Sequence, residues 1–404
     1  MVNISIMNIV VAGVGYVGLV TGLCLAKLGH TIQFLDVDSN KIKSLKNKKI
    51  PFYEPDLEDL LYEQNVSDNV SFYDEYKNVN WENLDVFMIC VQTPASPEGS
   101  IDTSFMNKVF SDLDSYISSD TIICIKSTIH PSAIDSFLNE SSSFSERIVF
   151  NPEFLKEGTA IYDFFNPDRI IVGSENLSNS KKIALLYEQI SKEIIFTDPI
   201  SSQLIKYLSN SYLPMRLSFA NEASRLITTL GGNLSEVLNG VGLDSRIGQS
   251  YLRPSPGWGG SCFPKDLKEI QNLANSNSLE LPLIEMVSHS NFIHMQWFAK
   301  NLITIMNDKS LKNIILIGAS FKENTDDYRH SPSLLIYRHL RDESIKVYIY
   351  EKEIMLDKEF ETISNFKEDS LVVEMFPLAK DIKDKYLNEL NNFQNYYYYN
   401  YWEE

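Results

Sequence analysis

A glycine-rich turn near the N-terminus constrains the fold more than any other feature of this sequence. Asn8–Ala12 is a short apolar segment typical of a buried strand. Three glycines follow it in Gly-x-Gly-x-x-Gly spacing: Gly13, Gly15 and Gly18. Residues 19–28 then have helical apolar spacing, and residues 31–37 predict a second strand that carries Asp36. This order, with the acidic residue at roughly the 20-residue distance expected, predicts a dinucleotide-binding βαβ unit.

The chemistry of this turn favours NAD as the cofactor. The glycines permit a tight turn and let a pyrophosphate approach the helix N-terminus. Asp36 is expected to accept hydrogen bonds from the ribose hydroxyls and to repel a 2′-phosphate, which favours NAD over NADP. Lys41 either flanks the ribose or phosphate or is a solvated lysine. A structural βαβ unit that binds nothing is the alternative to a cofactor site.

Three further apolar segments end in polar residues. Their ranges are 85–91, 121–126 and 147–150, and the residues that follow them are Gln92-Thr93-Pro94, Ser127-Thr128 and Asn151-Pro152-Glu153. Ligands bind at the carboxyl ends of strands in open parallel sheets, so these residues are candidates for the site. Glu153 and Glu157 are four residues apart, and a helical turn there would direct both carboxylates the same way. The alternative is a solvated acidic first turn of a helix.

The middle of the chain is mostly helical in pattern. Residues 201–230 predict a long helix with a kink at Pro214, and Lys206 and Asn210 lie four apart on one face of it. Taken alone, this pair also fits a surface lysine and a helix-weakening asparagine. Shorter or later helices are expected at 235–240, 269–275, 281–306 and 333–340, and further strands at 170–173, 194–197, 313–318, 346–350, 371–374 and 396–402.

These elements predict an α/β protein of two Rossmann-like, doubly wound lobes joined by a long central helix and a helical dimerisation domain. We expect an NAD-binding domain at residues 1–199 and a central helical domain with a cysteine loop at 200–306. A second Rossmann-like domain is expected at residues 307–404. It lacks a Gly-x-Gly-x-x-Gly turn after its first strand but could still bind a nucleotide, and the family resemblance given below implies that this is the substrate's nucleotide.

Residues 257–266, Gly-Trp-Gly-Gly-Ser-Cys-Phe-Pro-Lys-Asp, hold the candidate nucleophile. Cys262 follows three glycines, with Lys265 and Asp266 behind it. Nearby cations favour a reactive thiolate, although a buried structural cysteine in a glycine-rich turn is the alternative. The other cysteines lie in apolar segments and are expected in the core: Cys24, Cys90 and Cys124. Their spacing is not that of a metal site or a disulfide framework.

The composition excludes some classes of partner. The net charge of −18 argues against nucleic acid and anionic membrane surfaces. Hydrophobic content of 44% and charged content of 22% are ordinary for a soluble globular protein. The N-terminus lacks a signal-peptide pattern, and no apolar run reaches the length of a membrane span, so we expect a cytoplasmic protein.

Taken in order, these motifs resemble the UDP-glucose/GDP-mannose dehydrogenase family. The resemblance rests on the glycine turn, Ser127-Thr128, residues 151–160, Pro167-Asp168-Arg169, Lys206 with Asn210, residues 257–266, and Phe321-Lys322 with Arg329. Residues 157–160 and 167–169 favour the branch that oxidises UDP-glucose. A sister enzyme acting on GDP-mannose or a UDP-N-acetylhexosamine, and a non-catalytic NAD sensor, are the alternatives. The family oxidises a sugar C6 alcohol to a carboxylate with two NAD⁺ and one water.

The resemblance also implies residue roles and a homodimer. Catalytic roles fall to Cys262, Lys206, Asn210, Asp266, Glu153 and Thr128. Cofactor contacts fall to Gly13, Gly15, Tyr16, Val17, Gly18, Asp36, Lys41, Thr93, Thr128, Glu157, Lys265 and Arg329. UDP-glucose contacts fall to Glu153, Phe154, Leu155, Lys156, Glu157, Lys206, Asn210, Arg246, Tyr251, Leu252, Arg253, Gly259, Cys262 and Lys322, and no metal is implied. The chain departs from the usual pattern at Gln92, His130, Trp258 and His330.

Overall fold

The fold is described from a computed structural model of the chain. It covers residues 6–93, 104–113, 115–131, 134, 138–139, 144–191, 193–352, 354–393 and 395–401. The chain divides into two compact units, Met1–Leu208 and Ser209–Glu404. The predicted three-domain division, with boundaries after residues 199 and 306, is finer than this and stays a prediction.

The first unit is built on an eight-stranded sheet in the order β3-β2-β1-β4-β5-β6-β7-β8. Only the β6–β7 pair is antiparallel among these neighbours. The strands are β1 (Asn8–Ala12), β2 (Thr31–Leu35), β3 (Val70–Tyr73), β4 (Val86–Ile89), β5 (Ile122–Ile125), β6 (Ile148–Phe150), β7 (Ile170–Gly173) and β8 (Ile194–Thr197). The order 3-2-1-4-5-6 of its first six strands is the doubly wound one, with a topological switch point between β1 and β4.

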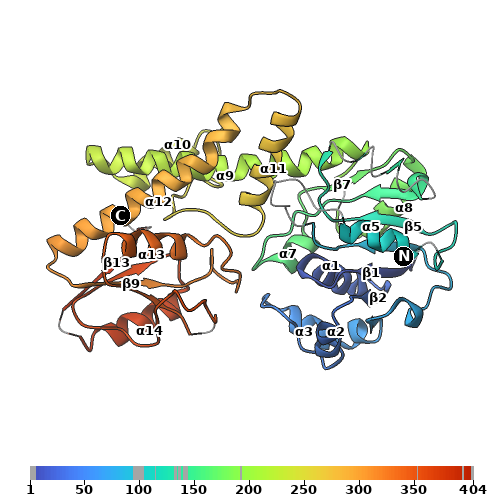
Figure 1. Cartoon of the computed structure of the whole chain (residues 1–404), viewed down its shortest axis with the longest axis horizontal. Coiled ribbons are helices and arrows are strands. Elements are labelled where there is room, and N and C mark those ends of the chain that lie inside the picture. The colour runs from blue at the N-terminus through green and yellow to red at the C-terminus, as the bar shows by residue number, and fades with distance from the viewer. Residues whose placement is uncertain are drawn as a thin grey trace. The chain divides into compact units, whose positions relative to one another are not determined.

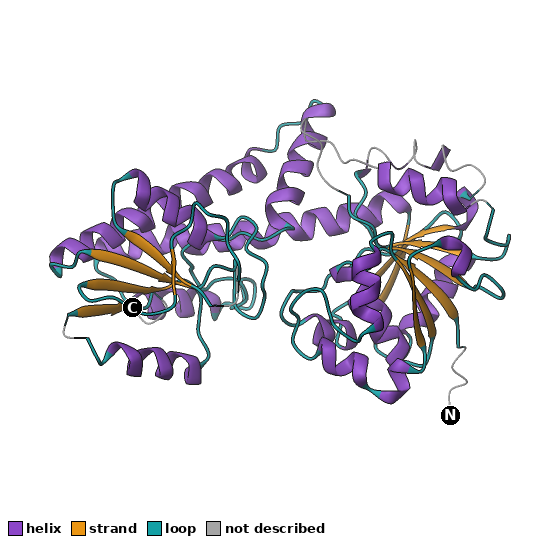
Figure 2. Cartoon of the chain, turned by 60° about the horizontal axis from the view of Figure 1, so that its bottom comes forward, coloured by secondary structure: helices purple, strands orange, loops and turns teal. Residues whose placement is uncertain are grey.

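Helices cover both faces of this sheet (Figures 1 and 2). They are α1 (Tyr16–Lys27), α2 (Ser39–Lys46), α3 (Leu57–Tyr62), α4 (Gln64–Ser67), α5 (Ser104–Leu113), α7 (Ala160–Phe165) and α8 (Leu177–Ala184), with short 3₁₀ turns at Tyr76–Asn78, Ser145–Arg147 and Leu185–Tyr187. One apolar cluster joins α1, α7 and α8 to one face, and another joins α5 to the opposite face. The central strands β1, β4 and β5 are almost fully buried, which explains their continuous apolar sequences.

Strand register aligns the loops that carry the predicted site residues. Ala12 lies opposite Leu35 on one side and Ile89 on the other. Ile89 pairs with Ile125, which pairs with Phe150. The residues after these strands therefore leave the sheet at one edge, as the sequence predicts.

The second unit contains a five-stranded parallel sheet in the order β11-β10-β9-β12-β13. Its strands are β9 (Asn313–Ile317), β10 (Val347–Tyr350), β11 (Thr362–Ile363), β12 (Ser370–Glu374) and β13 (Tyr396–Tyr399). The helices are α10 (Leu234–Gly242), α11 (Phe263–Ser276), α12 (Pro282–Asp308), α13 (Pro332–Asp342) and α14 (Lys380–Leu390). Helices α12 and α13 pack on one face of the sheet, and α14 covers the other (Figure 1). The predicted final strand ends at Tyr399, and Trp402 lies outside the described residues.

Helix α9 (Pro199–Leu230) is the longest element, and the boundary between the units falls within it. It matches the predicted long helix and contains Pro214. The predicted α/β class with two Rossmann-like sheets and a long central helix is confirmed. Within the described part of the chain, no helix is both long and apolar enough to span a membrane.

Candidate active site

The glycine turn of the first unit is tightly packed at one glycine and open at another. A Cβ on Gly18 would lie 2.0 Å from the Gly13 carbonyl oxygen, so only glycine fits where α1 crosses β1. Beyond its immediate chain neighbours, a Cβ on Gly15 would meet no atom of the described residues within 4 Å. Gly15 is also the N-cap of α1, where backbone N–H groups attract phosphate. The open cradle at Gly15 therefore fits the pyrophosphate of a dinucleotide.

The turn itself orients the predicted ribose acceptor. Asp36 follows β2, and its Oδ2 accepts a 2.7 Å hydrogen bond from the Val14 N–H. Its Oδ1 accepts one from the Asp38 N–H at 2.9 Å. The carboxylate is thereby fixed beside the glycine turn, as a ribose-binding group must be. Lys41 lies in α2, where its backbone N–H is bonded to the Asp38 side chain.

A buried carboxylate that sequence reasoning missed, Glu54, joins the cofactor turn to the loop after β6. It accepts hydrogen bonds of 2.7 Å each from the Tyr16 hydroxyl, the Gly158 N–H and the Ala160 N–H. Burial and the Glu54 charge raise the pKa of Tyr16, so its hydroxyl remains a donor. Glu54 lies in an irregular segment before Pro55, where periodicity carries no signal of its partners.

Lys206 and Glu153 form an almost fully buried ion pair. The Lys206 Nζ lies 3.0 Å from Glu153 Oε1 and donates to the Glu153 carbonyl at 2.6 Å. The Leu155 N–H donates to Glu153 Oε2 at 2.6 Å. Burial alone would raise the pKa of Glu153, but Lys206 and these hydrogen bonds hold the pKa below its usual range. Glu153 is therefore ionised at neutral pH.

The helical turn considered for residues 151–158 is wrong, because these residues adopt an irregular loop. The Asn151 side chain donates to the Ile171 carbonyl and accepts from Lys126 and Tyr187. These bonds anchor the loop to β5 and β7 in place of a helical ladder. Buried Lys126, which also donates to the Asn151 carbonyl, was not singled out from the sequence.

Other predicted residues of the first unit lie around this loop. The Phe154 ring lies 3.7 Å from the Arg169 guanidinium carbon and 5.2 Å from Lys206 Nζ. Exposed Lys156 pairs with Asp163 at 2.9 Å. Three more predicted site residues lie in this unit. Thr128, after β5, and Glu157, in the loop, are partly buried, and Thr93, after β4, is buried.

In the second unit, Cys262 stands at the N-terminus of a helix. Helix α11 begins at Phe263, earlier than the sequence pattern predicts, because Pro264 suits the first helical turn. Cys262 is its N-cap and is exposed, with Sγ 3.6 Å from the Ser261 hydroxyl. A helix N-terminus stabilises negative charge, as a thiolate nucleophile requires. The alternative of a buried structural cysteine is thus wrong for Cys262, whereas Cys24 and Cys124 are buried and Cys90 is partly buried.

Asp266 lies one turn into the same helix. Its Oδ2 accepts a 2.7 Å hydrogen bond from the Asn210 amide of α9, and Lys265 Nζ lies 3.2 Å from Oδ1. Glu269, a further turn along, is fully buried, and neither of its oxygens has a hydrogen-bond partner among the residues that the structure describes. Burial raises the pKa of Glu269 to about 7, with Asp266 adding to the rise and Lys265 opposing it. The family resemblance implies a cofactor contact for Lys265. In the structure its ammonium pairs with Asp266.

The cysteine loop packs against the polar loop after β9. A Cβ on Gly259 would lie 2.0 Å from the His330 carbonyl oxygen, and the Gly260 N–H donates to the Arg329 carbonyl at 3.0 Å. The Arg329 guanidinium pairs with Asp327 at 2.7 Å. Lys322 Nζ lies 5.5 Å from the Phe321 ring.

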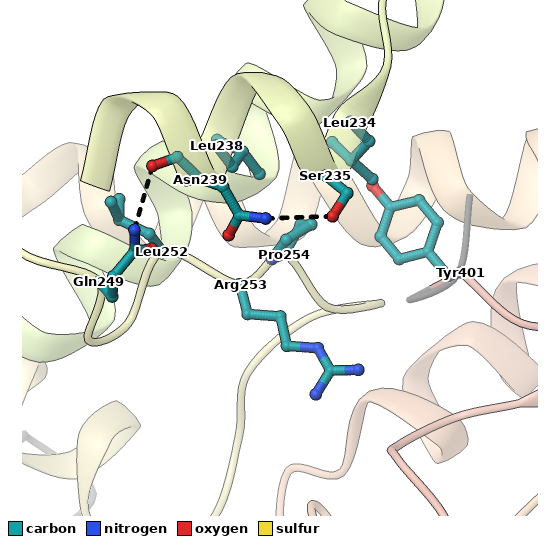
Figure 3. A pocket seen from close by; sticks show the side chains of 9 residues that line it. All are labelled: Leu234, Ser235, Leu238, Asn239, Gln249, Leu252, Arg253, Pro254 and Tyr401. Carbon is teal, nitrogen blue, oxygen red and sulfur yellow. Dashed lines mark hydrogen bonds between the residues drawn. The ribbon is translucent and has the colours of Figure 1, made fainter. Parts of the chain in front are cut away.

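A pocket of about 270 Å³ lies beside the segment that leads to this loop. Its lining residues come from α10, from residues 249–254 and from the C-terminal end: Leu234, Ser235, Leu238, Asn239, Gln249, Leu252, Arg253, Pro254 and Tyr401 (Figure 3). Leu252 and Arg253 are predicted substrate residues, but Cys262 is not among the lining residues. Tyr251, beside them, has a positive φ of 61°, and Arg246 forms a 2.6 Å ion pair with Asp244.

Fold and site together define a dinucleotide-binding α/β protein with a helix-capping cysteine in its second unit. Models of the UDP-glucose/GDP-mannose dehydrogenase family match three parts of the chain: the NAD binding domain at 7–191, the central domain at 200–292 and the UDP binding domain at 315–383. The chain belongs to this family. It is a dehydrogenase that uses NAD, so the family and cofactor expected from the sequence are confirmed.

Relatives and solved structures agree with this assignment. A UDP-glucose 6-dehydrogenase of Rickettsia conorii is 36% identical over 345 residues, which cover 84% of this chain and 80% of that protein. One of Bacillus subtilis is 34% identical, over 85% and 76% of the two chains. The UDP-glucose dehydrogenase structure from Pyrobaculum islandicum superposes with a TM-score of 0.84 at 26% identity, covering 98% of both chains.

Two glycines of the cofactor turn give a matched test of NAD binding. Gly15→Ala adds a methyl group that would touch none of the described residues except its chain neighbours, so we expect a small change in melting temperature but at least tenfold weaker NAD binding. Gly18→Ala forces a clash with Gly13, so we expect loss of both stability and binding. Thermal unfolding and NAD titration calorimetry measure the two effects. Unchanged NAD affinity in Gly15→Ala would contradict this placement of the cofactor.

Proposed function

We propose that this protein oxidises the C6 alcohol of UDP-glucose to the carboxylate of UDP-glucuronate, in two steps that each deliver a hydride to NAD⁺. The observation that carries the proposal is the exposed, helix-capping Cys262, one turn before an Asp266 that is hydrogen-bonded to Asn210. Relatives named UDP-glucose 6-dehydrogenases, at 34–36% identity over 84–85% of the chain, support the substrate.

In the first oxidation, Glu153 acts as the base. Its depressed pKa keeps the carboxylate ionised, so it accepts the C6 hydroxyl proton directly or through a water. The bound cofactor supplies the hydride acceptor for each oxidation. The product of this step is the C6 aldehyde.

Cys262 then attacks the aldehyde carbon. The new C–S bond gives a thiohemiacetal, and the carbonyl oxygen carries the negative charge as the bond forms. Lys206 and Asn210, four residues apart on α9, are suited to stabilise this oxyanion. Loss of the second hydride and of the hydroxyl proton converts the thiohemiacetal to a thioester.

Water completes the reaction by hydrolysing the thioester. We assign Asp266 and Thr128 to hold this water. One Asp266 oxygen already accepts from Asn210, and the other lies 3.2 Å from the Lys265 ammonium. Attack forms the C–O bond, the C–S bond breaks to release the Cys262 thiolate, and the protons that the water loses pass to solvent.

The remaining predicted contacts stay proposals. We assign NAD to the glycine turn with Asp36, Lys41, Thr93, Glu157, Lys265 and Arg329. We assign the UDP-sugar to Phe154, Leu155, Lys156, Arg246, Tyr251, Leu252, Arg253, Gly259 and Lys322. The match of residues 315–383 to the UDP binding domain supports a uridine nucleotide. A sister nucleotide-sugar dehydrogenase is the second candidate, since a GDP-mannose dehydrogenase of Pseudomonas aeruginosa is 25% identical with a TM-score of 0.56.

We also propose that the protein acts as a cytoplasmic homodimer. The four cysteines are free thiols, in keeping with a reducing compartment. On α9, apolar side chains more than half exposed recur at heptad-like spacing: Tyr212, Phe219, Leu226 and Leu230. Such a stripe is self-complementary across a two-fold axis, which favours a second copy of this chain as its cover.

The stoichiometry of NADH tests the proposed reaction. We expect two NADH per UDP-glucose, with UDP-glucuronate as product. Cys262→Ser should stall, because a serine ester hydrolyses poorly. One NADH per sugar would remove Cys262 from the mechanism. Faster turnover of GDP-mannose than of UDP-glucose would favour the second candidate.

Sedimentation equilibrium tests the dimer. The wild type should have twice the chain mass of 46.3 kDa, and Phe219→Glu should dissociate it by placing a charge in the stripe. Met355→Glu changes an equally apolar but more exposed residue outside the stripe and should remain dimeric. A wild type that sediments at 46.3 kDa would contradict the proposal.

A further inference from the structure

The segment that leads to Cys262 has no helix or strand of its own. Residues 252–261 form an irregular connection, although Leu252, Pro254 and residues 256–260 are buried. Buried backbone N–H and C=O groups must find partners elsewhere. Four polar side chains from α9 and α12 supply partners at Ser255 and Trp258, and all belong to the second unit.

Helix α12 contributes two of these side chains. The Asn291 amide pairs with both backbone groups of Trp258, accepting from its N–H at 3.1 Å and donating to its C=O at 2.9 Å. One turn further along the helix, His294 Nε2 lies 2.7 Å from the Ser255 carbonyl oxygen. A carbonyl oxygen only accepts, so Nε2 carries the proton and donates it.

Helix α9 contributes the other two. Asn221 Oδ1 accepts from the Ser255 N–H at 2.7 Å, and Ser218 Oγ accepts from the Trp258 indole N–H at 2.9 Å. Both backbone groups of Ser255 and of Trp258 are therefore bound by side chains. Trp258 is therefore held by three hydrogen bonds, two between its backbone groups and Asn291 and one from its indole to Ser218.

All four side chains are more than nine-tenths buried: Ser218, Asn221, Asn291 and His294. Burial lowers the pKa of His294 to about 4, so the ring is a neutral donor at working pH. His294 also stacks on Trp297 at 5.7 Å between ring centroids. Buried polar groups among apolar neighbours are costly unless they are hydrogen-bonded, and here most of their bonds go to one short loop.

We infer that Asn291 and His294, supported by Asn221 and Ser218, are positioning residues for the nucleophile. They hold Ser255 and Trp258 so that the chain delivers Cys262, four residues after Trp258, to the start of α11 in one conformation. The inference rests on the proposed role of Cys262. A nucleophile must be held within a fraction of an ångström of its attack geometry, and a loop without a backbone ladder needs side chains to do this.

Asn291→Asp is the sharpest test, because it keeps the shape of the side chain. The carboxylate still accepts from the Trp258 N–H but repels the Trp258 carbonyl. Asn301→Asp is the matched control: Asn301 lies on the same helix, and its amide donates to the Tyr399 hydroxyl at 3.4 Å. A second pair separates hydrogen bonding from packing at residue 294: His294→Gln keeps a donor, and His294→Leu does not.

Two readouts distinguish positioning from general stability. The first is the rate at which iodoacetamide alkylates Cys262 without substrate, followed by peptide mass. The buried cysteines Cys24 and Cys124, whose thiol pKa values are raised by burial, should react slowly. The second is a comparison of kcat with UDP-glucose and KM for NAD. The glycine turn proposed to bind NAD lies in the first unit, so a change confined to the cysteine loop should leave KM for NAD unaltered.

We expect Asn291→Asp to change the alkylation rate at least fivefold and to lower kcat at least tenfold, with KM for NAD within twofold of wild type. Asn301→Asp and His294→Gln should remain near wild type, while His294→Leu should follow Asn291→Asp. Wild-type alkylation and kcat in both Asn291→Asp and His294→Leu would overturn the inference, as would equal losses in Asn301→Asp. If the wild type does not oxidise UDP-glucose, the proposed function fails, and the alkylation rates still decide the positioning role.

Discussion

The buried ion pair between Lys206 and Glu153 is the interaction on which the first unit's site depends. It fixes the start of the longest helix against the loop that follows β6, and it keeps Glu153 ionised. Removing one partner would strand a buried charge at a cost of about 3–5 kcal/mol. The pair therefore couples the stability of this region to its protonation: stability is full above the ordinary carboxyl pKa and is lost as pH falls through the depressed pKa of Glu153.

The two units solve the same problem of loop placement in different ways. In the first unit, parallel register brings the strand ends to one edge, and Glu54 ties two of the resulting loops together. In the second unit, the cysteine loop has no strand before it, and side chains of α9 and α12 replace the missing ladder. Helix α9 serves both arrangements, since it carries Lys206 in one unit and Asn210 in the other.

The sequence patterns predicted the elements whose structure depends on neighbouring residues. Apolar runs located the central strands, and glycine spacing with Asp36 located the cofactor turn. The prediction of a helical turn at 151–158 was wrong because side-chain hydrogen bonds hold this loop in another conformation. The Asn151 side chain bonds to the Ile171 carbonyl, and the Glu153 side chain accepts from the Leu155 N–H. Asn291, His294 and Glu54 were not recognised, because their partners lie 33 or more residues away. The two-residue strand β11 is too short for any periodicity.

The central claim is that Cys262 carries the sugar as a thioester. Asp266→Asn should slow hydrolysis while leaving an amide that still reaches Asn210, so the acylated enzyme should accumulate. The direct measurement is to quench this variant during turnover with UDP-glucose and NAD and to weigh its Cys262 peptide. The account predicts a mass increase equal to the UDP-glucuronyl group on Cys262, lost after hydroxylamine treatment. An unmodified Cys262 peptide, from a variant that still produces NADH, would contradict it.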